Sequence, residues 1–495
     1  MEEVLISDTC IDEVLSNHKF LLDFSKDKII YGVNTGFGPM AQYIIPPKDL
    51  ERLQYNLIRS HASGTGNWIS PIHARATVYA RLVSMCQACS GIHPDTIKAL
   101  ANFLNLKVTP CIPEHGGVGA SGDLVQLAHL ALNLIGEGNI LNGGVELSAS
   151  TVFEKNNITP LKMHLREGLA LINGTSAMTG IGLTNILSAK KLLHWSLILC
   201  GFMNEITSAY DDHHAEALNN AKKHKSQSQI AGYLRKILSD SKCTKERYED
   251  LAKNEGQNGV LKNKLQEFYS IRCVPQILGP IYKTILEAET TLISELNSAN
   301  DNPIVDHKKG NVFHGGNFHG DYVSLEMDKL KIAITKLCML VERQINFLLN
   351  EKINGKLPPF INLGTLGLNF GMQGMQFTAT STTAENQMLS NPMYVHSIST
   401  NNDNQDIVSM GTNSALISSR VIMNTFEVLS VGLLSATQAV DALEIQSKLS
   451  SATSAIYQDI RKTHKKIIED KPASESLKSM VAKLKELPYN DILNW

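Results

Sequence analysis

Residues 327–350, MDKLKIAITKLCMLVERQINFLLN, carry large apolar side chains at steps of three and four along the chain. This spacing places them on one stripe of an α-helix, and such a stripe faces a hydrophobic core. The stripe consists of Leu330, Ile334, Leu337, Val341, Ile345 and Leu348. The stretch therefore predicts a long core-facing helix, and helix is the dominant pattern in the rest of the chain.

Two other stretches predict helices that are buried on every side. Residues 413–440 are apolar almost throughout, with Arg420 and Glu427 as their only charges. The stretch from Thr179, TGIGLTNILSAKKLLHWSLILCGFMNEI, has a similar pattern. Helices of this kind lie at the centre of large bundles or in subunit interfaces. We therefore expect a mainly α protein, built as a large elongated helical bundle with a mixed, loop-rich N-terminal part.

Composition excludes several classes of partner. Charged residues make up 19% of the 495 residues and the net charge is −2, so no basic surplus points to nucleic acid or to an anionic membrane. The N-terminus lacks the pattern of a secretory signal, and no segment runs uncharged and apolar for about 20 residues. We expect a cytoplasmic protein that acts on a small molecule. We also expect two domains, at residues 1–200 and 201–495.

Two short motifs resemble metal sites, but neither predicts one. Cys86 and Cys89 form a CxxC motif without a second pair, and with Leu82 and Met85 they fit one apolar helix face with buried thiols. Residues 209–217, AYDDHHAEA, are interpreted as a polar helix patch, because consecutive residues of a helix point in different directions. The sequence therefore predicts no metal.

The glycine-rich stretch HGGVGASGDLVQL, residues 115–127, contains the pattern G-x-G-x-x-G. A dinucleotide site would need a buried parallel strand before this pattern, and the preceding LKVTPCIPEHG carries two prolines. A serine-hydrolase elbow, G-x-S-x-G, fails because Asp123 follows Gly122. A plain alternative is a glycine turn that caps a helix at Asp123. We expect no nucleotide.

Ala120-Ser121-Gly122 permits chemistry that the turn interpretation leaves out. The Gly122 nitrogen has no side chain beside it, and a tight turn presses it against the Ala120 carbonyl. Ring closure and dehydration of Ser121 together remove two waters and leave an exocyclic methylidene. Such a group is a carbon electrophile made from the chain itself.

The motifs GGVGASGDL, YGVNTGFGPM and NGTSAM, together with YSIRCVPQILGP, SANDNPIVD, GGNFHGDYVS and NQDIVSMGTNSA, carry a family resemblance. The chain resembles the aromatic amino acid ammonia-lyases, which deaminate histidine, phenylalanine or tyrosine with a methylidene-imidazolone (MIO) group formed from Ala-Ser-Gly. The resemblance implies the fumarase/aspartase-like lyase superfamily fold, with the MIO group in the N-terminal part, and a homotetramer with shared active sites. Two departures are visible: Gly117 stands where many members have serine, and Val125-Gln126 where many have Ala-Pro.

The resemblance also implies roles for single residues. Tyr31 matches the catalytic base, Tyr269 the tyrosine that assists at the MIO group, and Arg272 the residue that holds the substrate carboxylate, a task suited to a planar two-pronged donor. Gln266 lies three residues before Tyr269 and would extend the helix face that Tyr269 and Arg272 share.

Asn173 matches the amide that contacts the MIO carbonyl, and Glu385 matches a site carboxylate. Without the resemblance, each of these residues has a plainer interpretation. Tyr31 would be a packing anchor and Arg272 would be half of an ion pair. Asn173 would be a turn residue and Glu385 a solvated charge.

Two features of the sequence disagree about the substrate. Ser60-His61 resembles the pair found in histidine enzymes, whereas Asn404-Gln405 and Gln387 resemble phenylalanine and tyrosine enzymes. A hydrogen bond from the tyrosine hydroxyl to His61 would reconcile them. We expect deamination of L-tyrosine to trans-p-coumarate and ammonia. A histidine ammonia-lyase giving urocanate and an MIO-dependent tyrosine aminomutase remain alternatives.

Two hypotheses from other classes are weighed against this one. A fumarase-like lyase with a mobile serine base would need no MIO group, and the glycine turn argues against it. A catalytically inactive helical scaffold would have no reason to keep Tyr31, Ser121 and Arg272 together.

Overall fold

The computed structural model describes residues 3–253, 260–261 and 264–486. Contacts divide the chain into two compact units, each built from three segments. Unit 1 comprises Met1–Ile186, Ala288–Asp328 and Pro392–Ser419, and unit 2 comprises Leu187–Glu287, Lys329–Asn391 and Arg420–Trp495. The expected single boundary at residue 200 does not describe this division. The chain leaves unit 1 and returns to it twice. Four of the unit boundaries fall inside long helices, one in each of α8 (Ser176–Thr207), α13 (Val274–Leu296), α14 (Asp321–Leu349) and α17 (Gly411–Leu443).

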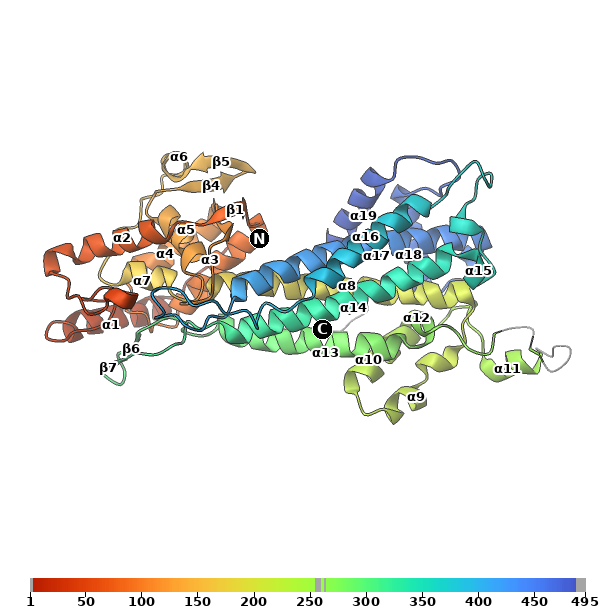
Figure 1. Ribbon diagram of the computed structural model, residues 1–495, viewed down its shortest axis with the longest axis horizontal. Coiled ribbons are helices and arrows are strands. Elements are labelled where there is room, and N and C mark those ends of the chain that lie inside the picture. The colour runs from red at the N-terminus through yellow and green to blue at the C-terminus, as the bar shows by residue number, and fades with distance from the viewer. Residues whose placement is uncertain (1–2, 254–259, 262–263, 487–495) are drawn as a thin grey trace. The chain divides into compact units, whose positions relative to one another are not determined.

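Unit 1 combines helices with glycine-rich loops (Figure 1). Unit 1 takes the first parts of α8, α14 and α17 and the last part of α13. Its other helices are α1 (Asp8–Phe24), α2 (Leu50–His61), α3 (Pro71–Met85), α4 (Pro94–Asn105), α5 (Leu124–Leu134), α6 (Ala149–Asn156) and α7 (Glu167–Ile172), with the 3-10 turns η1 (Gly38–Met40) and η2 (Pro47–Asp49). α2, α5 and α7 pack against one another. Side chains of Ser7, Ser70 and Ser148 accept backbone N–H groups at the starts of α1, α3 and α6, which satisfies donors that a helix start leaves free.

The strands of unit 1 form small antiparallel sheets. β1 (Thr65–Trp68) pairs with β3 (Pro113–His115), β4 (Asn139–Asn142) lies between β2 (Thr109–Pro110) and β5 (Val145–Ser148), and β6 (Ile304–Asp306) pairs with β7 (Asn311–Phe313). The glycine-rich stretch at residues 115–127 thus follows the short antiparallel strand β3. A dinucleotide fold needs a parallel strand there, so the structure agrees with the rejection of that interpretation.

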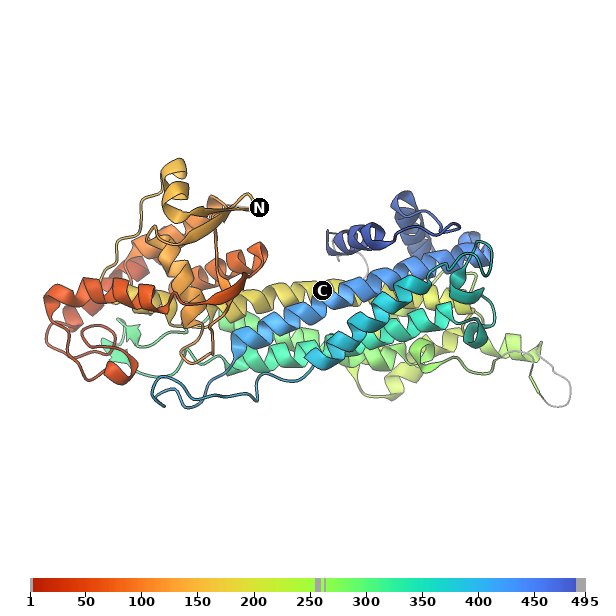
Figure 2. The ribbon, with the colours of Figure 1, turned by 45° about the horizontal axis from the view of Figure 1, so that its top comes forward.

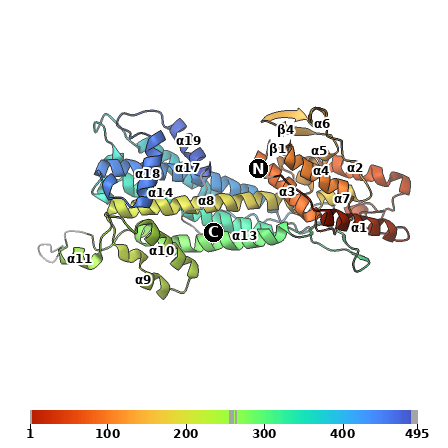
Figure 3. The same ribbon diagram turned by 180° about the vertical axis from the view of Figure 1, so that it is seen from behind.

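Unit 2 is a helical bundle around the later parts of α8, α14 and α17 (Figures 1 and 2). Its other helices are α9 (Glu216–Ala221), α10 (Lys225–Ile237), α11 (Arg247–Ala252), α12 (Tyr269–Arg272), the first part of α13, α15 (Glu351–Asn354), α16 (Gln373–Leu389), α18 (Ser451–Thr463) and α19 (Ser474–Glu486), with the 3-10 turns η3 (Asp211–His214), η5 (Pro359–Ile361) and η6 (Gln446–Lys448). α9 and α10 pack as neighbours (Figure 3).

Gly432 marks where three long helices of unit 2 meet. A Cβ atom on Gly432 of α17 would lie 2.8 Å from Leu199 of α8 and 3.2 Å from Val341 of α14. Only a residue without a side chain allows this approach, and protein interiors are packed too closely for the neighbours to yield freely.

The predicted helices are confirmed. All six stripe residues of 327–350 are at most 1% exposed, and α14 begins earlier than expected, at Asp321. α8 and α17 are long and apolar enough, by length and composition, to cross a membrane. However, 83% of the most apolar 18-residue stretch of α8 and 78% of that of α17 are buried inside the protein. Buried core helices of a bundle have this composition as well.

Candidate active site

Unit 1 contains a cavity of about 1050 Å³. α2, α5 and α7 contribute to its walls, together with residues near Tyr31 and in the segments 314–319 and 401–407. The cavity brings together most of the site residues expected from the sequence: Tyr31, His61, Ala120, Ser121, Asn173, Asn404 and Gln405. Segments that are far apart in the sequence thus supply one pocket.

Backbone hydrogen bonds hold the Ala-Ser-Gly turn on two sides. On one side the Gly174 N–H donates to the Ser121 carbonyl at 3.2 Å, and the Asp123 N–H donates to the Gly174 carbonyl at 2.8 Å. On the other side the Ser409 N–H donates to the Gly119 carbonyl at 3.3 Å. The turn is therefore clamped between the start of α8 and the segment before α17.

Gly122 cannot be replaced in this conformation. Its φ is +71°, in the left-handed region that favours glycine, and a Cβ atom would lie 2.0 Å from the Gly174 carbonyl oxygen. Ala120 is buried and lines the cavity together with Ser121, and the turn at Gly122 admits only glycine. Ring closure between Ala120 and Gly122 needs a tight turn of this kind with no side chain beside the attacking nitrogen, so the residues fit an MIO group.

Two amide side chains contact Ser121. Asn173 Nδ2 donates to the Ser121 carbonyl at 3.4 Å, and Gln405 Nε2 donates to Ser121 Oγ at 3.1 Å. The Asn173 Oδ1 atom accepts the Asn302 N–H at 2.8 Å, which orients the amide. The Ser121 carbonyl oxygen stays in the ring that this turn would form, so Asn173 is placed to stabilise negative charge on it, whereas the Oγ atom that Gln405 contacts is the oxygen lost in the dehydration.

Asp123 lies buried directly behind the turn. Its carboxylate accepts the N–H groups of Ala177 and Met178, both at 2.8 Å, and the hydroxyl of Thr412. Burial raises the pKa of Asp123 to about 6, and these hydrogen bonds oppose the rise. The plain alternative, in which Asp123 caps the helix that follows it, does not hold for its side chain. Asp123 stands at the start of α5, but the carboxylate caps α8, whose first turn lies closer to it.

Tyr31 and His61 lie on the cavity wall, and each has one polar side-chain atom within hydrogen-bond distance of a backbone group. The Tyr31 hydroxyl oxygen accepts the Gly38 N–H at 3.2 Å. The His61 Nδ1 atom lies 2.9 Å from the Leu57 carbonyl oxygen. Donation by Nδ1–H to that carbonyl leaves Nε2 as the atom that is able to accept a hydrogen bond.

The remaining predicted site residues belong to unit 2 and do not line this cavity. Arg272 lies over the ring of Tyr269, with 4.9 Å between its guanidinium carbon and the ring centroid, so the two side chains lie on the same side of α12. Glu385 on α16 forms an ion pair with Arg420 at 3.3 Å. The expectation that Gln266 extends the helix face of Tyr269 and Arg272 is wrong, because α12 begins only at Tyr269 and Gln266 lies in a bend before it.

Several cavity residues were not predicted as site residues: Asn302, His314, Phe318 and His319. Burial, with a smaller effect of Arg166, lowers the pKa of His314. The motifs SANDNPIVD and GGNFHGDYVS contain Asn302, Phe318 and His319, and His314 directly precedes the second motif, but the sequence offered no reason to give these residues roles. They join the site because the β6–β7 hairpin, which begins within the first motif and ends just before the second, returns the chain to the same region.

The two departures from the family pattern contact each other. A Cβ atom on Gly117 would lie 2.4 Å from Gln126 Oε1, and the Gln126 side chain is fully buried. The glycine therefore makes room for the glutamine, which explains why the chain carries both.

Two other expectations are corrected. α3 ends at Met85, so Cys89 lies in the loop beyond the helix rather than on its face. Ala88 between them has φ 52°, which a continuing helix does not allow. His213 and His214 form no exposed polar patch: they are only 5% and 2% exposed, because the chain turns them inward within η3.

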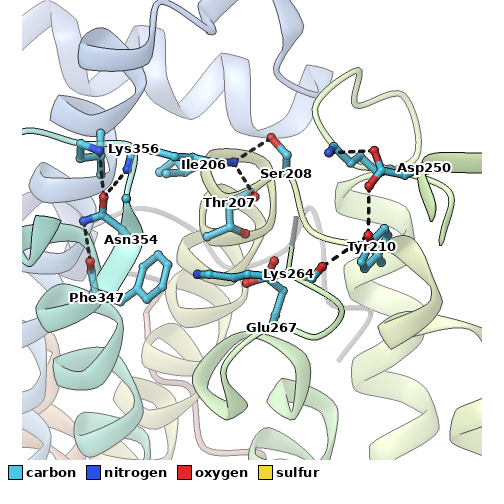
Figure 4. A pocket seen from close by; sticks show the side chains of 13 residues that line it. Ile206, Thr207, Ser208, Tyr210, Asp250, Lys264, Glu267, Phe347, Asn354 and Lys356 are labelled. Carbon is cyan, nitrogen blue, oxygen red and sulfur yellow. Dashed lines mark hydrogen bonds and ion pairs between the residues drawn. The ribbon is translucent and has the colours of Figure 1, made fainter. Parts of the chain in front are cut away.

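A second cavity, of about 300 Å³, lies in unit 2 (Figure 4). Its charged groups are largely matched: Lys356 donates to the Thr207 carbonyl at 2.8 Å, and Lys245 pairs with Asp250 at 2.9 Å. None of the site residues expected from the sequence, all of which the structure describes, lines it. The candidate site is therefore the unit 1 cavity.

Comparisons with known proteins agree with this site. The family model "Aromatic amino acid lyase" matches residues 1–462. The chain is 39% identical over 440 residues to the MIO-dependent tyrosine 2,3-aminomutase of Streptomyces globisporus, covering 88% of this chain and 81% of the relative. It is 36% identical to the tyrosine ammonia-lyase of Cupriavidus metallidurans, with 92% of this chain and 87% of the relative covered. It is 37% identical to the histidine ammonia-lyase of Geobacillus thermodenitrificans, with 94% of this chain and 89% of the relative covered. The solved structure of Pantoea agglomerans phenylalanine aminomutase matches with a TM-score of 0.92 and 36% identity, covering 97% of this chain and 94% of that one.

Proposed function

Because the chain belongs to the aromatic amino acid lyase family, we propose that it converts L-tyrosine to trans-p-coumarate and ammonia with an MIO group formed from Ala120, Ser121 and Gly122. The observation that carries this proposal is the clamped Ala-Ser-Gly turn, whose Ser121 receives hydrogen bonds from both Asn173 and Gln405 in a cavity of substrate size. When formed, this group supplies the electrophile that takes up the substrate amine.

In this proposal the other residues bind the substrate and move its protons. Tyr31 on the cavity wall removes the β-proton, and the bond between Cα and nitrogen then breaks to leave a double bond and ammonia. Asn173 stabilises the negative charge that develops on the Ser121 carbonyl oxygen, and Gln405 holds the Ser121 hydroxyl that leaves as water when the group forms. His61 Nε2 accepts the hydrogen bond of the substrate hydroxyl, which favours tyrosine over phenylalanine.

In our proposal the protein is a homotetramer in the cytoplasm. A neighbouring subunit brings Arg272 and Tyr269 to the cavity, together with Gln266 and Glu385. Tyr269 is 69% exposed in the single chain. Large apolar side chains also lie exposed around the start of α16, at Leu366, Leu368, Phe370 and Phe377, each at least 61% exposed. Exposed apolar groups gathered in this way are typical of surfaces that a partner covers.

The first experiment tests the MIO group without relying on activity. Intact-mass spectrometry of the purified chain is expected to show a loss of two waters, which Ser121→Ala abolishes. Ser239→Ala, at an exposed serine, serves as the control and keeps the loss. An unmodified mass for the wild-type chain would contradict the proposal. Turnover of L-tyrosine should disappear in Ser121→Ala and persist in Ser239→Ala.

The second experiment tests the substrate. We expect tyrosine to be preferred over phenylalanine and histidine, and His61→Leu to reduce kcat/KM for tyrosine by about 10-fold or more relative to phenylalanine, since one hydrogen bond to the hydroxyl is lost. Urocanate as the main product from a mixture of the three amino acids would establish histidine lyase activity instead.

An aminomutase is the second candidate, because a relative that is 39% identical carries that name, against 36% for the tyrosine ammonia-lyase. Such an enzyme adds ammonia back at the β-carbon, so product analysis distinguishes the two. We expect coumarate without β-tyrosine, and β-tyrosine as the main product would replace the lyase proposal by the aminomutase.

A further inference from the structure

Three side chains from two separate parts of unit 1 meet outside the cavity. His93 and Asp95 lie at the start of α4, and His164 lies in the loop before α7. One potential ligand atom from each lies within 4.8 Å of the others, and the two imidazole rings are 4.7 Å apart. None of the three lines the site cavity.

A third imidazole borders this cluster. His18 on α1 is 5% exposed, and its ring centroid lies 5.3 Å from that of His93 and 6.0 Å from that of His164. Its Nδ1 atom lies 2.9 Å from the Gly91 carbonyl oxygen. A proton on Nδ1, donated to this carbonyl, leaves the Nε2 lone pair available. Metal ions bind neutral imidazole.

Glu167 holds the backbone that carries both histidines of the cluster. Its buried carboxylate accepts the His93 N–H at 2.9 Å, the His164 N–H at 2.6 Å and the Thr96 hydroxyl at 2.9 Å. One acidic group thus joins α4, the loop before α7 and the start of α7 itself. These hydrogen bonds fix the backbone positions of the two histidines relative to each other, which keeps the ligand-bearing segments together.

We propose that His93, Asp95 and His164 bind a divalent ion of the zinc class, with the His18 ring beside them. Two imidazoles and a carboxylate suit zinc, cobalt or nickel rather than magnesium or calcium, which prefer sites made of oxygen atoms. Zinc takes its ligands at about 2.0–2.2 Å, so two ligand atoms of one ion lie at most about 4.2 Å apart. Ligand atoms within 4.8 Å come to that range by small side-chain rotations.

The ion would act on the cavity through α7. Bound at the start of α4 and beside the start of α7, it would tie the two helices together. Leu169 and Ile172 of α7, and Asn173 directly after it, line the cavity. The site would therefore stabilise unit 1 and the wall of the cavity without touching the substrate. This inference does not depend on the proposed reaction.

The test is metal binding by the full chain, prepared without a histidine tag and stripped with a chelator. We expect isothermal titration with Zn²⁺ to show one tight site per chain, Co²⁺ to give the absorption bands of a site with nitrogen ligands, and Mg²⁺ to give no signal. Zinc should also raise the melting temperature, since an ion that binds only the folded state stabilises it.

Variants identify the ligands. His93→Gln, His164→Gln and Asp95→Asn should each weaken zinc binding by about 10-fold or more, whereas His224→Gln, at an exposed histidine of unit 2, should bind as the wild type does. Asp95 is more than half exposed, so its variant is expected to fold even where a histidine variant does not. Absence of a tight zinc site in the wild type, or unchanged binding in Asp95→Asn and the histidine variants that fold, would overturn the proposal.

Discussion

At the scale of single residues, the site depends on a few polar contacts around one strained turn. Ser121 is contacted by Asn173 from the end of α7 and by Gln405 from the 401–407 loop, and Gly122 occupies a conformation that no other residue fits. Tyr31 is the cavity residue that we propose as the base, and its hydroxyl oxygen is held by the Gly38 N–H. The prediction that belongs here concerns this hydroxyl.

Replacement of Tyr31 by Phe removes the proposed base and keeps the ring. We expect kcat to fall by about 10²–10⁴-fold, the range typical of one general acid or base, with a smaller change in KM. The melting temperature and the loss of two waters in the intact mass should stay as in the wild type. Steady-state kinetics on L-tyrosine measure this, and a kcat within a factor of a few of wild type would exclude Tyr31 as the base.

At the scale of elements, close helix packing positions the turn. α8 begins at Ser176, two residues after Gly174, and the N–H groups of its first turn are held by Asp123 behind the turn. Along the same helix, Gly180 packs against α3: a Cβ atom there would lie 2.6 Å from the Ala76 carbonyl carbon and the Thr77 nitrogen. Backbone atoms cannot move aside as a flexible side chain does.

Gly180→Ala is therefore expected to destabilise unit 1 by about 1–3 kcal/mol, the usual effect of overpacking. Gly232→Ala in α10 is the matched control, since its nearest neighbour is the end of Arg235 at 3.7 Å. There the better helix propensity of alanine should stabilise the protein by up to about 1 kcal/mol. Urea denaturation of the two variants beside the wild type measures both effects, and equal shifts in the two variants would contradict the packing argument.

At the scale of the whole molecule, buried histidines couple stability to pH. Burial lowers the pKa of His73 on α3 from 6.5 to about 4 and that of His214 to about 3. An unfolded chain accepts these protons below pH 6.5 while the folded chain does not, so their contribution to stability is present above that pH and is lost as the pH falls toward 4. Asp123, with its pKa raised to about 6, acts in the opposite direction: its contribution is present below pH 3.8 and is lost as the pH rises through 6.

His73→Gln isolates one of these effects. Compared with the wild type, the variant should lose less unfolding free energy between pH 7.5 and pH 4.5, with a difference of at most about 3 kcal/mol, since one pKa unit corresponds to about 1.4 kcal/mol. Denaturant titrations at the two pH values measure this difference. An identical pH dependence in both proteins would show that His73 does not titrate as its burial implies.

Assembly also belongs to this scale. Ser121 lies in unit 1 and Arg272 in unit 2, and we propose that a complete site takes them from different subunits. Ser121→Ala and Arg272→Ala should each be inactive alone, and tetramers refolded from an equal mixture should recover activity, to roughly a quarter of wild type if subunits mix at random. Activity assays before and after mixing measure this. No recovery in tetramers shown by mass spectrometry to be mixed would mean that each site comes from one chain.

The sequence by itself determined the helical class, the long core helices and the Ala-Ser-Gly turn, because these depend on local spacing and on the special conformations of glycine. Resemblance in its motifs pointed to the family and to Tyr31, Asn173 and Gln405. Only the tertiary structure decided which residues share a cavity. Asn302 and His319 joined the site, Gln266 left the helix face expected for it, and Asp123 caps α8 rather than the helix it precedes. These outcomes depend on contacts between residues far apart in the chain, and the spacing of residues along one segment does not contain them.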